Sequence, residues 1–413
     1  MRTGYVTQWF PPEPGTVVPE SIARGLAEQG HTVDVLTGFP NYPTGKVMPG
    51  YRIRPYQREV LTPAITVHRA PLFPSHSSAA VPRMANYASF AAGASAVARA
   101  KVARPDVWLI YSSPATAAVP ALRLLRRTQA PIFLLIQDLW PDSVTDSGFV
   151  GGLPGRVVTD VLDRFCRLTY RRASGIGIIS PGMRAVLVAR GVPDAIIHDT
   201  PNGIDDSHLL PHATPSAAAR AAFGLADGRL FMYAGNLGEL QGLDALIRAF
   251  AARPDAQLVL VGDGVARTRL VALAHDLGAS NVRFLGQVSL AQVGELIAQS
   301  DVQIVSLHDT PLLRVTMPSK VQTSLAAGRA VLAHAAGDAA SIVTDNRVGW
   351  SAAPGDPEAV LAALDLALAT SDAELEAMGR AARALFEERF SRDSGARRLS
   401  DALEATVAHA AHA

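Results

Sequence analysis

Two glycines follow a short apolar run in the second half of the chain and precede a helical pattern. In the stretch YAGNLGELQG they are Gly235 and Gly238. Backbone without side chains at the start of a helix offers free N–H groups and the positive end of the helix dipole to a phosphate. The turn from a strand into a helix also requires glycine for its geometry alone. The same two interpretations, phosphate binding and turn geometry, apply to the glycines that follow two further apolar runs. These glycines are Gly262, Gly264 and Gly286.

A lysine lies at the predicted start of a helix in the stretch SLHDTPLLRVTMPSKVQTSLAAGRAVLA. It is Lys320, one of three lysines in a chain whose basic residues are otherwise arginines. An ammonium group beside a helix N-terminus can neutralise a diphosphate, whereas the alternative is a solvated cation. Arg314 and Ser319 lie on the same stretch, and we expect them to face the same crevice. The predicted chemistry is therefore the binding of a diphosphate group.

Acidic residues in the first half of the chain are candidates for binding and activating a hydroxyl group. Asp138 and Asp142 belong to the motif QDLWPDS, which follows an apolar run. A carboxylate at the end of a strand can orient or deprotonate an acceptor hydroxyl. Capping the next helix is an equally good interpretation of Asp142. Glu13, on the first loop, is a weaker candidate for the same role as Asp138.

The elements that must position these residues form two domains. The chain has 413 residues, 48% of them hydrophobic. This length exceeds what a single hydrophobic core usually supports, so two domains are expected. Short apolar runs alternate with amphipathic segments throughout, a pattern typical of α/β folds with doubly wound parallel sheets. The periodicity breaks around Ile204, so we predict domains at 1–203 and 204–390, with a C-terminal helix at about 391–413 packing back onto the first. Ligands bind α/β sheets outside the carboxyl ends of the strands, so the chemistry should lie between the domains.

Helices are predicted wherever apolar residues recur with helical spacing. In the first half these segments are Val18–Gln29, Met84–Lys101, Ala117–Arg127 and Arg156–Arg172. The last of them carries several arginines and could rest on a membrane, although a solvated face is the simpler interpretation.

Composition excludes several classes of protein. The formal net charge is +1, so no global field would attract nucleic acid. The single cysteine, Cys166, can form neither an intramolecular disulfide nor a zinc cluster. No apolar run reaches the length of about 18 residues that a membrane-spanning helix needs. We expect a cytoplasmic protein without a metal, with peripheral contact to the inner membrane face left open.

Nine motifs, in this order, resemble those of glycosyltransferase family 4, and in particular its branch of bacterial fucose and N-acetylfucosamine transferases. The resemblance runs nearly end to end. The motifs are FPPEPG, GHTVDVLTGFPNYPTGK, IQDLWPDS, IISPGMRAVLVARGV, PNGID, YAGNLGELQGLDALIRAF, LVLVGDG, FLGQV and PSKVQTSLAAGRAVLA.

The resemblance implies a GT-B fold, in which two Rossmann-like domains face a central cleft. It also implies retention of anomeric configuration and no required cofactor or metal. We expect catalysis by Asp138, Lys320 and Arg314, and acceptor binding by Glu13, Asn41, Tyr42, Gln137 and Asp138. The donor residues that it implies are Gly15, Gly235, Asn236, Leu237, Gly238, Gln241, Gly262, Gly286, Gln287, Val288, Met317, Pro318, Ser319, Lys320 and Thr323.

Several positions depart from the pattern that the resemblance implies. The two glutamates of the E-x7-E motif are replaced by Val315 and Thr323, and a basic pair is replaced by Asn236 and Gln241. A lost carboxylate contact to a ribose diol costs about 2 kcal/mol. One hypothesis is that the donor lacks a ribose 2′-hydroxyl, as dTDP-sugars do. Gln137 stands where a histidine is usual.

The function predicted from the sequence is transfer of a sugar, including a deoxy or amino sugar, from a dTDP-, UDP- or GDP-sugar to an acceptor hydroxyl. The acceptor is either a secondary metabolite or a lipid-linked saccharide, in antibiotic or polysaccharide biosynthesis. The enzyme would work as a monomer or homodimer. Two alternatives remain: a nucleotide-sugar epimerase of the same architecture, and a non-catalytic auxiliary protein, which the missing acids suggest.

Overall fold

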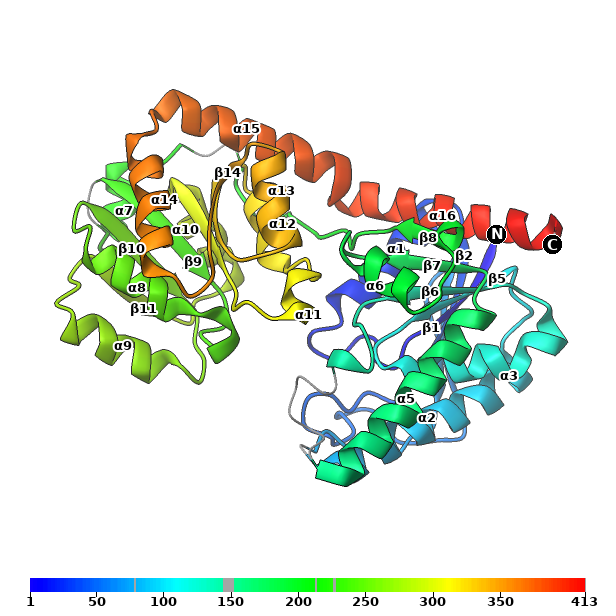
Figure 1. Cartoon of the computed structure of the whole chain (residues 1–413). Helices are drawn as coiled ribbons and strands as arrows, with labels where there is room; N and C mark the ends of the chain where they lie inside the picture. The colour runs from blue at the N-terminus through cyan, green and yellow to red at the C-terminus, as the bar shows by residue number, and fades with distance from the viewer. Residues whose placement is uncertain (78, 144–151, 212–213, 226–227, 413) are drawn as a thin grey trace. The chain divides into compact units, whose positions relative to one another are not determined.

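The computed structural model divides the chain into two compact units. The first unit comprises Met1–Gly203 together with Arg392–Ala413, and the second comprises Ile204–Ser391. Figure 1 shows the ribbon of both units. The structure describes all residues except 78, 144–151, 212–213, 226–227 and 413, and it does not describe the side chains of 80 and 152–158.

The first unit is built on an eight-stranded sheet with the order β3-β4-β2-β1-β5-β6-β7-β8. Most of its strands are short apolar runs buried on both faces, as is usual for parallel strands. In sheet order, the strands are β3 (Gln57–Thr62), β4 (Ile65–Ala70), β2 (Thr32–Gly38), β1 (Arg2–Val6), β5 (Val107–Tyr111), β6 (Ile132–Ile136), β7 (Gly175–Ile178) and β8 (Ile197–Asp199).

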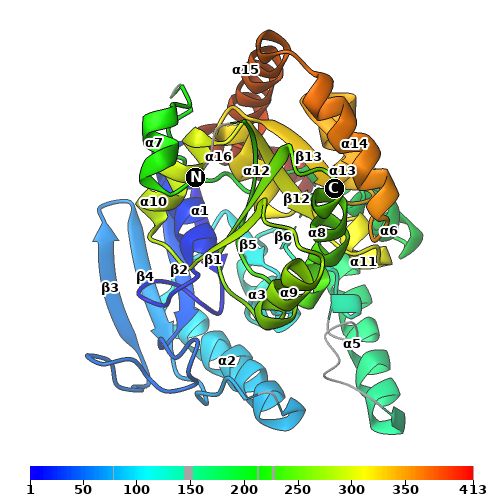
Figure 2. The ribbon, with the colours of Figure 1, turned by 90° about the vertical axis from the view of Figure 1, so that its left-hand side faces the viewer.

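The edge strand β3 departs from the predicted parallel pattern. It pairs antiparallel with β4, and the hairpin of the two is visible in Figure 2. The sequence of β3, QREVLT, is largely exposed and carries charges, as edge strands do. It therefore lacks the continuous apolar run that is typical of the buried parallel strands.

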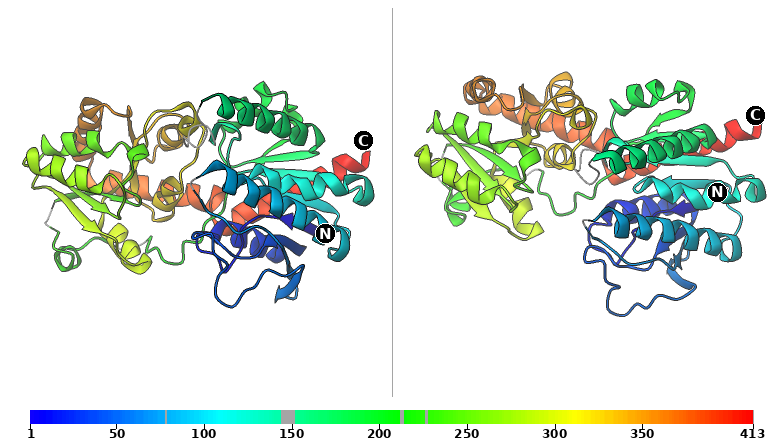
Figure 3. Two further views of the ribbon diagram at one scale, coloured as in Figure 1. Left: turned by 90° about the horizontal axis from the view of Figure 1, so that it is seen from below. Right: turned by 60° about the horizontal axis from the view of Figure 1, so that its bottom comes forward.

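Helices cover both faces of this sheet. On one face α1 packs with the C-terminal helix α16, whose Leu399 and Leu403 join Tyr5 and Val35 in one core cluster. The course of α16 (red) can be followed in Figure 3. The helices are α1 (Val17–Glu28), α2 (Ala80–Lys101), η1 (Ala115–Ala118), α3 (Val119–Thr128), α5 (Gly152–Arg172), α6 (Met183–Ala189), η2 (Asp194–Ile196) and α16 (Arg392–His412).

The second unit contains a six-stranded, fully parallel sheet with the order β11-β10-β9-β12-β13-β14. The chain proceeds outward from β9 to β11 on one side, then returns to add β12 to β14 on the other. This places a topological switch point between β9 and β12, where α/β folds bind ligands. The strands are β9 (Arg229–Ala234), β10 (Ala256–Val261), β11 (Val282–Gly286), β12 (Val302–Ser306), β13 (Ala330–His334) and β14 (Gly349–Ala352).

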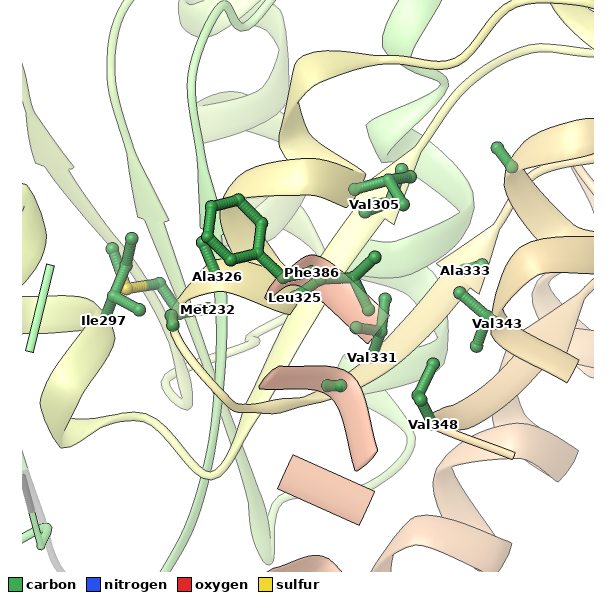
Figure 4. Packing of buried hydrophobic residues seen from close by; sticks show 14 of the residues in the cluster. Met232, Ile297, Val305, Leu325, Ala326, Val331, Ala333, Val343, Val348 and Phe386 are labelled. Carbon is green, nitrogen blue, oxygen red and sulfur yellow. The ribbon is translucent and has the colours of Figure 1, made fainter. Parts of the chain in front are cut away.

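Successive side chains of β9 point into two different cores of this unit. Met232 packs with residues of α10, α12, α13 and α15, whereas Phe231 and Tyr233 pack with α8, α9 and α14. Figure 4 shows Phe386 of α15 beside Leu325 of α12 in the first of these cores. The helices are α7 (Ala217–Ala222), η3 (Glu239–Gln241), α8 (Leu243–Ala251), α9 (Arg267–Asp276), α10 (Leu290–Gln299), α11 (Pro311–Arg314), α12 (Ser319–Ala326), α13 (Asp338–Asp345), α14 (Pro357–Ala369) and α15 (Asp372–Arg389).

The helices of the described residues differ from membrane-spanning helices. None of them combines the length and the apolar composition that crossing a membrane requires.

Candidate active site

A cavity of about 510 Å³ opens at the switch point of the second unit. Its walls come from the ends of β9 and β10, the loop after β11, and the helices α10 and α12. Of the predicted donor residues, eight line it: Gly235, Asn236, Gly262, Gln287, Val288, Ser319, Lys320 and Thr323.

Lys320 supplies the only lysine or arginine among the described residues that line this cavity. Its Nζ lies 5.2 Å from the centre of the Tyr233 ring. No carboxylate in the described part of the chain comes within ion-pair distance of it, and burial lowers the pKa of Lys320. Within the described residues the aromatic face of Tyr233 is the favourable electrostatic contact of this half-buried ammonium, and one such contact does not offset the desolvation cost of burying a charge. An anionic ligand would compensate it.

The backbone beside Lys320 can only be glycine. Gly235 has a φ of +138°, and a Cβ there would lie 2.5 Å from Cε of Lys320. Gly262 has a φ of +125°, and a Cβ there would lie 2.0 Å from the carbonyl oxygen of Gly235. The two turns therefore pack backbone against backbone at the ends of β9 and β10. This close approach leaves room for Lys320 against the turn after β9.

The two amides that replace the expected basic pair contact each other. Oε1 of Gln241 accepts hydrogen bonds from the backbone N–H of Gly238 at 3.0 Å and from Nδ2 of Asn236 at 3.5 Å. Asn236 lines the cavity and Gln241 does not. The structure therefore assigns Gln241 to shaping the loop.

Arg314, predicted to be catalytic, is engaged elsewhere. It lies on α11 and forms a two-pronged ion pair with Asp309, through Nε at 2.5 Å and Nη2 at 2.6 Å. Its side chain is exposed and it is not among the described residues that line the cavity. A carboxylate five residues earlier thus neutralises the guanidinium, and sequence spacing alone did not reveal this pair.

Other predicted donor residues serve the scaffold. Met317 and Leu237 are buried in the two cores, and Pro318 precedes α12 as its N-cap. Gly286 ends β11, and its carbonyl oxygen accepts the N–H of Gly262 at 2.8 Å. Thr323 lines the cavity, and its hydroxyl donates to the carbonyl oxygen of Ser319 at 3.0 Å. Its oxygen remains able to accept a hydrogen bond from a ligand.

A buried histidine supports the loop that precedes α8. The N–H of Gly355 donates to Nε2 of His334 at 2.8 Å, so the ring proton is on Nδ1, which lies 2.8 Å from Oγ of Ser306. The Ser306 hydroxyl in turn donates to the carbonyl oxygen of Gln241. This relay requires a neutral imidazole, because a protonated ring could not accept from Gly355. No motif in the sequence pointed to it.

The His334 relay predicts a specific loss of stability in acid. Burial, and secondarily the nearby His308, lowers the pKa of His334 from 6.5 to about 4. Between these values the unfolded chain binds the proton and the folded chain does not, so stability falls as the pH drops from 6.5 to 4. The contribution of this group is about 3 kcal/mol.

Urea unfolding across this pH range would measure the effect. A His334→Asn variant should be less stable at pH 7 but should lose less stability on acidification than the wild type. Equal slopes in the two proteins would contradict the assignment. Other buried histidines act in the same direction, and the comparison between variant and wild type removes their contribution.

Glu13, predicted to contact the acceptor, instead fastens two loops of the first unit. Its Oε1 accepts the backbone N–H groups of Asn41 at 2.7 Å and Tyr42 at 2.9 Å, and Oε2 accepts that of Phe10 at 3.1 Å. Glu13 is 3% exposed. Burial raises the pKa of Glu13, and the three backbone hydrogen bonds oppose this shift. Both oxygens are occupied, so the carboxylate holds the loops after β1 and β2 together.

The remaining acceptor candidates lie on these loops and on the loop after β6. The Tyr42 ring contacts Trp9, with ring centres 6.1 Å apart, whereas Asn41 is buried. A Cβ on Gly15 would lie 3.8 Å from Tyr42, and its φ of +78° fits a tight turn. Glycine is therefore favoured at this turn by its backbone conformation, without a ligand.

Asp138 and Gln137 are neighbours with different surroundings. Asp138 is exposed, and its Oδ2 accepts a hydrogen bond from the Ser113 hydroxyl at 2.7 Å. Gln137 exchanges two side-chain hydrogen bonds with Asn202, at 3.1 and 2.7 Å. The carboxylate of Asp138 remains accessible to a substrate, whereas the Gln137 amide is committed to the end of the first unit.

A larger cavity of about 800 Å³ lies at the opposite, amino-terminal edge of the second sheet. Two of its arginines are paired within the protein: Arg220 bonds Asp301 at 3.0 Å, and Arg229 bonds Asp372 at 2.9 Å. It is larger than the switch-point cavity, but the arginines just named are neutralised. We therefore take the smaller cavity, with Lys320, as the candidate active site.

Two family models match the chain, one in each unit. Residues 15–203 match the "Glycosyl transferase 4-like domain", and residues 217–385 match "Glycosyl transferases group 1". Together they span most of both units.

Relatives and solved structures agree with these matches. A putative colanic acid biosynthesis glycosyl transferase, WcaI of Escherichia coli K12, is 29% identical over 73% of this chain and 75% of its own. Sucrose-phosphate synthase of Thermosynechococcus elongatus superposes with a TM-score of 0.73 at 18% identity, covering 99% of both chains. HepE of Anabaena, crystallised with UDP, gives a TM-score of 0.69 at 15% identity, covering 98% of this chain and 100% of its own.

The architecture is therefore GT-B, with two Rossmann-like α/β units, as predicted. The chain belongs to the group 1 glycosyltransferases whose N-terminal part is a glycosyltransferase 4-like domain, and it is an enzyme of the glycosyltransferase class.

Proposed function

We propose that this enzyme transfers a sugar from a nucleoside diphosphate sugar to an acceptor hydroxyl with retention of anomeric configuration. The observation that supports this most strongly is the Lys320 ammonium group, half-buried in the cavity without a carboxylate partner among the described residues. Glycine backbone at Gly235 and Gly262 makes the neighbouring wall thin enough for a diphosphate to approach closely. The donor would occupy the second unit and the acceptor the first.

The proposed reaction exchanges one bond of the anomeric carbon for another. The bond from that carbon to the diphosphate oxygen breaks while a bond to the acceptor oxygen forms on the same face of the sugar. The acceptor proton passes to an oxygen of the departing diphosphate. Lys320 stabilises the negative charge that grows on the diphosphate, and this electrostatic contribution is the main work of the protein. Asp138 would orient the acceptor hydroxyl.

The class of donor nucleotide is proposed from a position at which the sequence departs from the family pattern. Thr323 replaces the usual ribose-binding acid and lines the cavity, which favours a donor with fewer ribose hydroxyls, a dTDP-sugar. WcaI is named for colanic acid biosynthesis, which supports a role in polysaccharide assembly. The acceptor is then a saccharide on a lipid carrier, with a secondary metabolite as the second candidate.

A panel of donors tests the proposal directly. The purified enzyme is incubated with dTDP-rhamnose, UDP-glucose, UDP-N-acetylglucosamine and GDP-fucose, with saccharide acceptors, and released nucleoside diphosphate and product are quantified. Transfer that requires an acceptor supports the proposal. Sugar conversion without an acceptor would indicate an epimerase, and binding of every donor without turnover would indicate an auxiliary protein. Best activity with a UDP- or GDP-sugar would overturn the dTDP assignment alone.

A further inference from the structure

The cavity of the second unit has a polar end and an apolar end. Gly235, Asn236 and Lys320 form the polar end, whereas Val288 and Leu290 belong to the loop after β11 and the start of α10. The dimensions and polarity suit a ligand that is anionic at one end and flat and apolar at the other. A nucleoside diphosphate is such a ligand.

His208 contributes the only ring among the described residues that line this cavity. It belongs to the segment that enters the second unit, and Val293 of α10 lines the same cavity. Neither a hydrogen bond nor an ion pair of its imidazole occurs within the described part of the chain. The ring is therefore free to contact a ligand without breaking an existing interaction.

The backbone of His208 is held firmly against α10. A Cβ on Gly294 would lie 2.0 Å from the carbonyl oxygen of His208, so only glycine permits this approach. The next residue, Leu209, is buried in the core, and its N–H donates to the carbonyl oxygen of Asp206 at 2.8 Å. The carboxylate of Asp206 is in turn bound by Arg383 at 2.6 Å. The segment that carries the ring is thus fixed on both sides.

We infer that His208 stacks against the nucleobase of the donor, a role that rests on the proposed function. A flat side chain gains affinity from any base, because every base has a π-face. Stacking therefore increases affinity for all nucleotides and selects poorly among them. Selection among bases falls to polar groups of the same wall, of which Gln287 is one.

If His208 stacks against the base, replacing it should weaken the binding of ligands that contain a base and should not affect ligands that lack one. In isothermal titration of the intact enzyme, His208→Leu should weaken binding of the best nucleoside diphosphate by about tenfold, a typical loss for one stacking contact. It should leave the affinity for inorganic pyrophosphate unchanged. His208→Phe should retain nucleotide affinity, because it keeps a flat ring. Lys320→Met should instead weaken both ligands.

The outcomes separate the two proposals. Nucleotide affinity that is unchanged in His208→Leu, or an equal loss for pyrophosphate, would overturn the stacking role and leave the donor site intact. A wild-type enzyme that binds no nucleoside diphosphate would overturn the proposed function itself. Thermal unfolding of each variant establishes that it is folded under the titration conditions.

Discussion

Replacing Lys320 with methionine should lower kcat/KM for sugar transfer by roughly 100- to 1000-fold, the cost of removing one preorganised group that stabilises transition-state charge. The ammonium is the only lysine or arginine among the described residues of the cavity wall, so no neighbour can substitute for it. Most of the loss should fall on kcat, because the charge on the diphosphate grows as its bond to the sugar breaks. Steady-state kinetics with the best donor would measure this.

Stability provides the control for the Lys320 prediction. Methionine has a similar length and no charge to bury, so the variant should unfold at the same temperature as the wild type or a higher one. Lys101→Met, at an exposed lysine on α2, should leave both activity and stability near wild type. An active Lys320→Met enzyme would remove the basis of the proposed donor site.

Gly262→Ala should destabilise the protein by about 3 kcal/mol, since it combines backbone strain with overpacking. The backbone of Gly262 has a φ of +125°, and the new Cβ would meet the carbonyl oxygen of Gly235 at 2.0 Å. The turn that faces Lys320 must then shift, so nucleotide affinity should fall with stability. Urea unfolding and nucleotide titration of the same variant would measure the two effects.

A second glycine serves as a control that separates backbone strain from overpacking. Gly278 also has a positive φ, +64°, but nothing lies within 4 Å of a Cβ placed there. Gly278→Ala should therefore cost only the conformational strain, about 1 kcal/mol, and leave nucleotide binding intact. Similar losses in the two variants would show that the contact between the turns is not the cause.

The fold was predictable because its signals are local. Buried parallel strands are continuous apolar runs, and the runs of β9 and β10 end in glycines that line the cavity proposed to bind the diphosphate. Lys320 was identified by its rarity and its place at the start of α12, and the structure places it in the cavity.

The partners of individual side chains were not predictable. Arg314 is neutralised by Asp309, and Glu13 is saturated by backbone N–H groups from another loop, 28 residues away along the chain. Tertiary geometry decides such pairings, and hydrophobic periodicity carries no information about them. The role proposed for His208 could not be predicted for the same reason, because the residue lies in an irregular segment whose position depends on its contact with Gly294.

The chain passes from the first unit to the second and then returns, so that α16 packs on the sheet that contains β1. During synthesis the second unit is therefore available in full before the first has received its last helix. Leu399 and Leu403 must be synthesised before they can cover Tyr5 and Val35. A chain truncated near residue 390 would contain the elements of the second unit but would leave an apolar face of the first unit without its covering helix.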